Sequence, residues 1–312
     1  MTKRTRIWFF GFLVIGFTLS ALQAQTPAQR KLPADRLDGP PVVSARAWAI
    51  ADGKTGKLLW GHKQGEPRVI ASITKVMTAW LVYLLALENP AILDEVVVIS
   101  EKADKTGGSS AGVKAGEKYV VRDLLHGLML PSGNDAAVAL AEHFGSRFAS
   151  DDTAKDDPHS LFVAEMNRKA KSLKMTKTKY YDPHGNSKNT STAAGVLRLT
   201  WHALQTPAFA RCVGTATYKC EAIRPDGSKR QVIWKNTNRL LTIEGFDGVK
   251  TGTTGRAGAC LVSSGWHGKD RLLVVVLGCT SNDSRYVDTR NLYRWAWRER
   301  GHQADGKRKG KE

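Results

Sequence analysis

Residues 71–77 read Ala-Ser-Ile-Thr-Lys-Val-Met, and the rest of the chain is best understood from this stretch. The apolar positions that follow predict a helix from Ser72 to about Leu87, ending before Pro90. Ser72 and Lys75 are one helical turn apart, so their side chains can meet on one face. A buried lysine held neutral can accept the proton of a serine hydroxyl and make it a nucleophile. A serine at a helix start is also a common N-cap, so this motif needs support from elsewhere in the chain.

Two later motifs give that support. Ser132-Gly133-Asn134 connects two expected helices, 117–130 and 135–144, although the same residue types also form ordinary turns. Lys250-Thr251-Gly252 precedes an expected strand. Ser-x-x-Lys, Ser-x-Asn and Lys-Thr-Gly motifs in this order are typical of penicillin-binding proteins and serine β-lactamases.

On these residues the chain resembles the low-molecular-weight penicillin-binding proteins, which are serine D-alanyl-D-alanine carboxypeptidases and endopeptidases. The resemblance runs from about Ala45 to Trp297. Beyond the three motifs it includes Thr55-Gly56-Lys57-Leu58-Leu59, Gly116-Glu117, Met166-Asn167, Asp182-Pro183-His184-Gly185, Ser191-Thr192-Ala193 and Ala257-Gly258. Family members commonly carry an acidic residue where this chain has Gly195, a departure that concerns local helix packing more than chemistry.

The resemblance implies acyl transfer through a covalent serine ester, with no cofactor. Ser72 would be the nucleophile, Lys75 the general base and Ser132 a proton relay to the leaving group. The residues implied to bind substrate are Asn134, Lys250, Thr251, Gly252 and Thr253. The backbone N–H groups of Ser72 and Thr253 would form the oxyanion hole.

The implied substrates are peptidoglycan stem peptides, and β-lactam antibiotics would be inhibitors that acylate Ser72. The leading interpretation is a D-Ala-D-Ala carboxypeptidase, and a D-Ala-meso-diaminopimelate endopeptidase that cuts crosslinks is the alternative. A class A β-lactamase is disfavoured, because none of the glutamates considered for deacylation has an asparagine four positions later; these are Glu142, Glu165, Glu221 and Glu244. An inactive cell-wall-binding protein is the remaining alternative.

Strands are expected at both ends of the domain and helices between them. Apolar runs around the turn 52–56 predict a hairpin, and so do the runs 259–263 and 271–277. The all-apolar run 272–277 indicates a strand covered on both faces. A closing helix is expected over 285–298. The fold class is therefore α/β (α+β), and the resemblance implies a β-lactamase/transpeptidase-like antiparallel sheet flanked by helices, with a helical insertion subdomain.

The chain divides into four segments by composition. Residues 1–24 are typical of a signal peptide, with a basic start, an apolar run and small residues at the end, although an uncleaved anchor is the alternative. Residues 25–41 form a proline-containing linker, residues 42–300 the serine peptidase domain, and residues 301–312 a basic disordered tail. The protein is therefore expected to be exported and to act in the periplasm or elsewhere in the cell envelope.

The formal net charge of +18 over 312 residues predicts attraction to polyanions. Anionic lipid and acidic wall polymers fit, and weak membrane association is expected through an uncleaved N-terminus or the tail. The sequence has no zinc-finger spacing or RNA-binding signature, so nucleic acid is not an expected partner.

The four cysteines are Cys212, Cys220, Cys260 and Cys279. In an exported chain Cys260 and Cys279 could face each other across a hairpin as a disulfide, or remain isolated buried thiols. Neither the cysteines nor the histidines have metal-site spacing, so no metal is expected.

Overall fold

The computed structural model describes residues 39–302. The predicted signal peptide (1–24), most of the predicted linker and most of the predicted basic tail lie outside the described residues.

A five-stranded antiparallel sheet forms the centre of the fold, and its strands come from both ends of the domain. Across the sheet they are β2 (Leu58–His62), β1 (Ala47–Asp52), β11 (Asp270–Cys279), β10 (Gly258–His267) and β9 (Phe246–Thr254). Both expected hairpins are confirmed, and β1 joins them by pairing with β11, with Ala47 opposite Leu277. Strand β9 is consequently an edge of this sheet.

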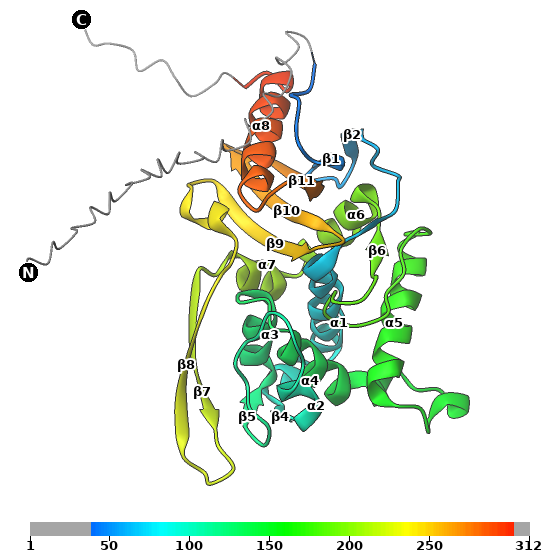
Figure 1. Cartoon of the computed structure of the whole chain (residues 1–312), viewed down its shortest axis with the longest axis vertical. Coiled ribbons are helices and arrows are strands. Elements are labelled where there is room, and N and C mark those ends of the chain that lie inside the picture. The colour runs from blue at the N-terminus through cyan, green and yellow to red at the C-terminus, as the bar shows by residue number, and fades with distance from the viewer. Residues whose placement is uncertain (1–38, 303–312) are drawn as a thin grey trace, which may run out of the picture. The chain divides into compact units, whose positions relative to one another are not determined.

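Helices cover both faces of this sheet (Figure 1). The run 272–277 of β11 sends alternate side chains into two separate cores, and all of them are 0% exposed, as the sequence predicts. Leu272, Val274 and Val276 pack with Tyr293 and other residues of α8 (Ser284–Glu299) on one face. The opposite face packs against the helical region that carries most of the apolar core.

The remaining elements build the helical region and two smaller sheets. The α-helices are α1 (Lys75–Glu88), α2 (Glu101–Asp104), α3 (Val121–Met129), α4 (Asn134–Phe144), α5 (Pro158–Ser172), α6 (Ala193–Leu204) and α7 (Pro207–Gly214). Short 3₁₀ helices are η1 (Ala71–Thr74), η2 (Pro90–Asp94), η3 (Gly145–Phe148), η4 (Asp151–Thr153) and η5 (Arg239–Thr242). One small sheet pairs β3 (Arg68–Val69) with β6 (Thr190–Ser191), and the other has the order β4 (Val96–Val98), β5 (Lys118–Val120), β7 (Thr217–Ile223), β8 (Lys229–Lys235).

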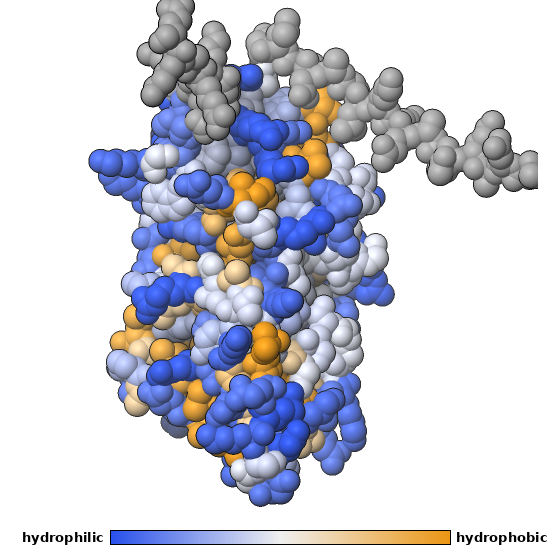
Figure 2. Space-filling model, turned by 90° about the vertical axis from the view of Figure 1, so that its left-hand side faces the viewer, coloured by the Kyte–Doolittle hydropathy of each residue, from blue (hydrophilic) through white to orange (hydrophobic). Residues whose placement is uncertain are grey.

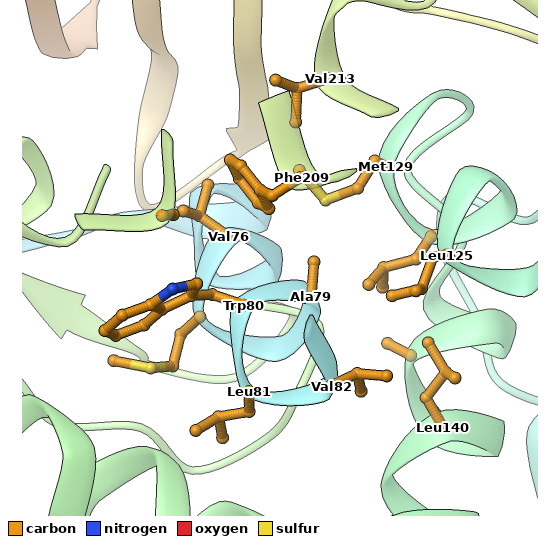
Figure 3. Close-up of a cluster of buried hydrophobic side chains, with 14 of the residues drawn as sticks. Val76, Ala79, Trp80, Leu81, Val82, Leu125, Met129, Leu140, Phe209 and Val213 are labelled. Atoms are coloured by element: carbon orange, nitrogen blue, oxygen red, sulfur yellow. The ribbon is translucent and has the colours of Figure 1, made fainter. Parts of the chain in front are cut away.

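Helix α1 lies at the centre of the helical region and holds Lys75, its first residue, in place. Figure 3 shows its side chains surrounded by side chains of α3, α4 and α7. Val76, Ala79 and Val82 are 0% exposed, and fully burying a valine contributes about 1.5–3 kcal/mol. Residues 71–88 have a mean hydropathy of 1.3 and are the one described segment long and apolar enough to cross a membrane, but 72% of the segment is buried inside the protein, as in a core helix.

The structure corrects four details of the sequence interpretation. The first turn of the Ser72 helix is the 3₁₀ helix η1, and α1 begins only at Lys75. Residues 118–120, expected to be helical, form β5, because Tyr119 is buried opposite Val97 of β4. Helix α7 was not expected. The Lys250 motif lies within β9 rather than before a strand.

All four cysteines are buried free thiols, so the isolated-thiol alternative describes this structure. Cys279 lies opposite Ala259 rather than Cys260, because the β10–β11 register shifts between Ala259 and Leu261. Burial raises the pKa of the Cys260 thiol to about 11, which keeps it protonated and unreactive.

Candidate active site

Lys75 is the point at which three separate parts of the chain meet. Its Nζ donates to Ser72 Oγ at 2.9 Å, to Asn134 Oδ1 at 2.7 Å and to the His184 carbonyl oxygen at 2.8 Å. These contacts join η1, the start of α4 and the loop 182–189. The predicted nucleophile and the predicted base are therefore within hydrogen-bonding distance, as a serine activated by an amine requires.

The environment of Lys75 favours its neutral amine. The residue is 0% exposed. Burial lowers the pKa of Lys75 well below 10.5, and the neighbouring Lys250 cation lowers it further, while Asp182 and Asp135 oppose the shift only in part. In the neutral form Nζ keeps two N–H donors, enough for Asn134 and the His184 carbonyl oxygen, and the Ser72 hydroxyl can donate to its lone pair.

Ser72 is held in η1 by an unusually close approach of two other segments. Ala71 has a positive φ of 48°, which turns the backbone immediately before Ser72. A Cβ on Gly185 would lie 2.0 Å from the Ala71 carbonyl oxygen, and a Cβ on Gly252 would lie 2.9 Å from Ser72 N. Only glycine can occupy these two positions, and Gly252 brings the edge of β9 against the Ser72 backbone.

The loop 182–189 is ordered by one buried carboxylate. Asp182 accepts from the backbone N–H groups of His184 at 2.9 Å and Ser187 at 2.5 Å, and from Asn189 Nδ2 at 3.1 Å. Asn189 Nδ2 also donates to Thr74 Oγ1 at 3.1 Å, which fastens the loop to η1. Burial acts to raise the pKa of Asp182, but the His184 imidazole and the hydrogen bonds from Gly185 and Ser187 outweigh it and lower the pKa. The ionised Asp182 carboxylate thus holds in position the His184 carbonyl group, to which Lys75 is hydrogen-bonded.

In the turn that contains Ser132 and Asn134, the asparagine side chain is hydrogen-bonded and the serine hydroxyl is not. Asn134 is fully engaged, because its Oδ1 accepts from Lys75 and its Nδ2 donates to the Gly107 carbonyl oxygen at 2.7 Å. Ser132 has a left-handed backbone with a φ of 68°, and its buried Oγ has no hydrogen-bond partner among the described residues. Such a strained, unsatisfied hydroxyl is a feature of functional sites. The loop 107–112 is held against this turn by Asp135, whose carboxylate accepts from Ala111 N at 2.9 Å.

Strand β9 supplies a second buried lysine. Lys250 is 1% exposed, and its Nζ donates to the Thr251 carbonyl oxygen at 3.1 Å. Burial lowers the pKa of Lys250 to about 7, and the nearby Arg285 cation contributes to the decrease. Thr251 Oγ1 lies 2.9 Å from Thr237 Oγ1, so its hydroxyl has a fixed position beside the lysine.

Arg285 of α8 is a cation of the site that the sequence motifs did not reveal. The residue is 8% exposed, and its Nη1 donates to Thr253 Oγ1 at 2.9 Å. Thr253 Oγ1 donates in turn to Asn282 Oδ1 at 2.9 Å. Lys250 of β9 and Arg285 of α8 therefore both lie at the β9 edge. Two cations together are suited to an anionic group on a ligand.

The structure brings most of the predicted site residues together. Ser72, Lys75 and Asn134 meet through direct hydrogen bonds, and Lys250 is close enough to affect the pKa of Lys75. Ser132 lies two residues before Asn134 in the chain. Its Oγ has no hydrogen bond to Lys75 or Lys250 among the described residues. Within residues 39–302, no group of three or more His, Cys, Asp or Glu side chains is placed to hold a metal ion.

Residues 35–281 match peptidase family S11, which is described as D-alanyl-D-alanine carboxypeptidase. The chain belongs to this family. A D-alanyl-D-alanine carboxypeptidase of Streptomyces sp. strain K15 is 33% identical over 272 residues, covering 85% of this chain and 91% of that protein. A D-alanyl-D-alanine endopeptidase of Pseudomonas aeruginosa is 31% identical, covering 88% of this chain and 83% of that protein.

The solved structures agree with the sequence comparisons. The crystal structure of the Streptomyces K15 DD-transpeptidase superposes with a TM-score of 0.76 at 33% identity, covering 83% of this chain and 99% of that one. The predicted fold class, an antiparallel sheet flanked by helices in the β-lactamase-like arrangement of this carboxypeptidase family, is confirmed. The chain spans 62% of the length of the related carboxypeptidases DacF of Bacillus subtilis and DacC of Escherichia coli.

The one departure from the family pattern noted in the sequence lies in the packing around α6. Gly195 N donates to Thr192 Oγ1 at 2.9 Å, and a Cβ at Gly195 would lie 3.0 Å from Ser191 Oγ. No hydrogen bond of this glycine reaches Ser72 or Lys75 among the described residues.

Proposed function

We propose that this carboxypeptidase-family enzyme hydrolyses the terminal D-Ala-D-Ala bond of peptidoglycan stem peptides through an acyl-enzyme on Ser72. The observation that carries the proposal is the 2.9 Å contact between Ser72 Oγ and the fully buried Lys75 amine. Family membership supports the substrate class, because the Streptomyces and Bacillus relatives are named D-alanyl-D-alanine carboxypeptidases.

In the acylation step Lys75 Nζ takes the Ser72 proton as Ser72 Oγ attacks the carbonyl carbon of the penultimate D-Ala. A bond forms between Oγ and that carbon, and the carbon–nitrogen bond to the terminal D-Ala breaks. The departing nitrogen receives the proton that Lys75 took from Ser72, and Ser132, which we expect to act as the relay, would pass it on. The N–H groups of Ser72 and Thr253 would stabilise the oxyanion, and each such donor contributes about 2.7–4 kcal/mol.

In the second step a water attacks the ester carbon, the bond to Ser72 Oγ breaks, and the serine recovers its proton. The net reaction consumes one water and releases the shortened peptide and D-alanine. The same attack on a β-lactam ring opens its amide bond and leaves the drug attached to Ser72, so β-lactams are expected inhibitors.

The cations of the β9 edge fit the terminal carboxylate of the substrate. Lys250 and Arg285 supply the charge, and the Thr251 hydroxyl supplies a directed hydrogen bond. A carboxylate bound here raises the pKa of Lys250 again, because an opposite charge favours the ammonium form. Asn134 would contact the substrate backbone after exchanging one of its present partners.

The carboxypeptidase interpretation is better supported than the endopeptidase alternative, since most of the related proteins carry that name and one is named an endopeptidase. Action on cell-wall peptides supports a location outside the cytoplasm. A cleaved signal peptide, a periplasmic site and weak membrane association remain predictions.

Two measurements test the proposal. The wild-type protein should release D-alanine from a stem pentapeptide and should be labelled by a fluorescent penicillin on Ser72. Ser72→Ala should lose both properties, while circular dichroism shows that it is folded. Penicillin labelling that persists in Ser72→Ala would contradict the assignment of the nucleophile.

A further inference from the structure

The hairpin formed by β7 and β8 lies on the outside of the helical region, and its tip is at the far end from β9 (Figure 1). Figure 2 views the molecule from the side of this hairpin, and hydrophilic residues cover most of its lower end. Two side chains of β8 point the other way, into the protein, and these are Arg230 and Trp234. Trp234 Nε1 donates to the Ala111 carbonyl oxygen at 2.7 Å, so the hairpin contacts the loop 107–112.

Arg230 contacts the same loop and is itself held by a buried carboxylate. Its Nη2 donates to the Gly112 carbonyl oxygen at 3.0 Å. Its Nε and Nη2 each donate to the Glu117 carboxylate at 2.7 Å. Glu117 is 3% exposed and also accepts from Lys114 N at 3.0 Å. Because a bidentate ion pair fixes the orientation of the guanidinium, Arg230 presents its remaining donor to the loop in one direction.

The other end of the loop holds Asn134. Asn134 Nδ2 donates to the Gly107 carbonyl oxygen at 2.7 Å, and Asn134 N donates to the Ser109 carbonyl oxygen at 2.7 Å. A Cβ on Gly108 would lie 2.6 Å from Asn134 Nδ2, so the loop backbone lies directly against this side chain. Asn134 Oδ1 in turn accepts from Lys75 Nζ at 2.7 Å. Hydrogen bonds at both ends of the loop thus connect β8 with the proposed general base.

The middle of the loop is bound from two sides. The Asp135 carboxylate of α4 accepts from Ala111 N at 2.9 Å and from Gly112 N at 3.0 Å. The carbonyl groups of the same two residues accept from Trp234 and Arg230 of β8. Helix α4 therefore binds the N–H groups, and the outer hairpin binds the C=O groups. A carbonyl that loses its donor can turn toward water, which would move the loop.

We propose that Arg230 is a positioning residue for acylation, which together with Glu117 holds the loop 107–112 so that Asn134 keeps its contact with Lys75. The inference rests on the proposed acyl-transfer function and adds to it a residue of the outer hairpin that does not touch the substrate. Misplacing a reacting group by about 1 Å can cost about 10²-fold in rate. Loss of Arg230 should therefore slow acylation, although the residue lies outside the site.

A double variant separates positioning from stability. Arg230→Met alone leaves the Glu117 carboxylate buried without its cation, which destabilises a fold strongly. Combining it with Glu117→Gln leaves no buried charge at this place, and the amide oxygen can still accept from Lys114 N. We expect the double variant to have a urea-unfolding midpoint close to that of the wild type. If Arg230 only stabilised the fold, acylation would then be normal, whereas a positioning role predicts that it stays slow.

Stopped-flow labelling with a fluorescent penicillin gives the limiting acylation rate and the dissociation constant of the complex that precedes it. We expect the limiting rate of the double variant to fall roughly tenfold to a hundredfold. The dissociation constant should change less than about twofold, because the proposed carboxylate ligands Lys250 and Arg285 have no hydrogen bond to the loop 107–112 among the described residues. A limiting rate within about twofold of the wild type would overturn the proposal.

Two further variants show whether the effect belongs to this arginine. Arg230→Lys keeps the charge but not the fork of donors, so it should retain part of the rate. Arg300→Met is the matched control, because Arg300 donates to Asp270 at 2.7 Å and to Asp52 at 3.0 Å. The Arg300 side chain is 29% exposed, compared with 27% for Arg230. The control should be acylated at the wild-type rate, and an equal loss in Arg300→Met and the double variant would overturn the proposal.

Hydrogen exchange tests the same contacts without any reaction. The amides of Ala111, Gly112 and Asn134 should exchange faster in the double variant than in the wild type or in Arg300→Met. Unchanged exchange in the double variant would also overturn the proposal. Wild-type protein that penicillin does not label would reject the proposed function, whereas equal labelling of the wild type and the double variant would reject only the role of Arg230.

Discussion

Replacing Lys250 with methionine should make the protein more stable at neutral pH, although it removes a proposed substrate-binding group. Burial, assisted by the Arg285 cation, lowers the pKa of Lys250 from 10.5 to about 7. One pKa unit corresponds to about 1.4 kcal/mol, so holding this lysine in the folded state costs about 4 kcal/mol at pH 7. Methionine has a similar length and no charge to desolvate. Loss of the hydrogen bond to the Thr251 carbonyl oxygen costs about 1 kcal/mol, which leaves a net gain of about 3 kcal/mol in the free energy of unfolding.

The pH dependence of this gain follows from the direction of the shift. Because the folded-state pKa is lowered, between about pH 7 and pH 10.5 the unfolded chain holds a proton that the folded chain has released. The wild-type protein therefore becomes more stable as the pH rises through this interval. The advantage of Lys250→Met should be largest at or below pH 7 and should disappear above about pH 10.5.

Urea unfolding followed by circular dichroism at about pH 6.5, 8 and 9.5 measures the gain. Lys219→Met is the control, because Lys219 is an exposed lysine on β7, and its replacement should change stability by less than about 0.5 kcal/mol. A Lys250→Met protein that is less stable than the wild type at pH 7, or a gain that does not vary with pH, would refute the reasoning. Either result would mean that Lys250 remains a stabilised cation in the folded protein without substrate.

Three further predictions concern the chemistry of the site and the loop that supports it. Lys75→Arg keeps a cation but removes the base, so penicillin acylation should fall by about 10²–10⁴, and a near-normal rate in a stopped-flow labelling experiment would show that Lys75 acts by charge alone. Lys250→Gln should slow acylation by penicillin, which carries a carboxylate, roughly tenfold to a hundredfold more than acylation by a neutral ester; equal losses, measured for both reagents at matched salt, would assign Lys250 to proton transfer instead. Asp182→Asn replaces a carboxylate that accepts three or more N–H groups with a neutral amide, so it should lower the free energy of unfolding by about 1–3 kcal/mol at pH 7 and slow acylation. Because the folded-state pKa of Asp182 is lowered, this stability difference should shrink as the pH falls below about 4, and urea unfolding that shows a pH-independent difference would assign it to packing.

Short-range patterns in the sequence were sufficient for the main elements of the fold. The alternation and turn residues around Asp52 and His267 are local, and both hairpins follow from them. Strand β5 is different, because the residues 118–120 pair with β4 only through the tertiary structure, and no local periodicity distinguishes them from the start of a helix. Helix α7 is short and begins at Pro207, which was interpreted only as the end of the preceding helix.

The same difference between local and long-range contacts applies to the candidate site. Ser72 and Lys75 are three positions apart, so their contact could be predicted from helix geometry alone. The contacts of Lys75 with Asn134 and the His184 carbonyl, and the approach of Arg285 to Thr253, join residues far apart in the chain. A backbone carbonyl has no residue-type signature, so the role of His184 could not be read from its side chain.

The pairing of β1 with β11 has a consequence for how the enzyme comes into being. These neighbouring strands are synthesised at opposite ends of the domain, and non-local pairing of this kind slows folding. A nascent chain that has emerged only as far as α7 already contains Ser72 and Lys75, but β9 has not yet been made to lie against them. The reactive serine therefore gains its neighbours late, after nearly the whole domain has been translated, so a prematurely terminated product would contain the motif and lack the chemistry.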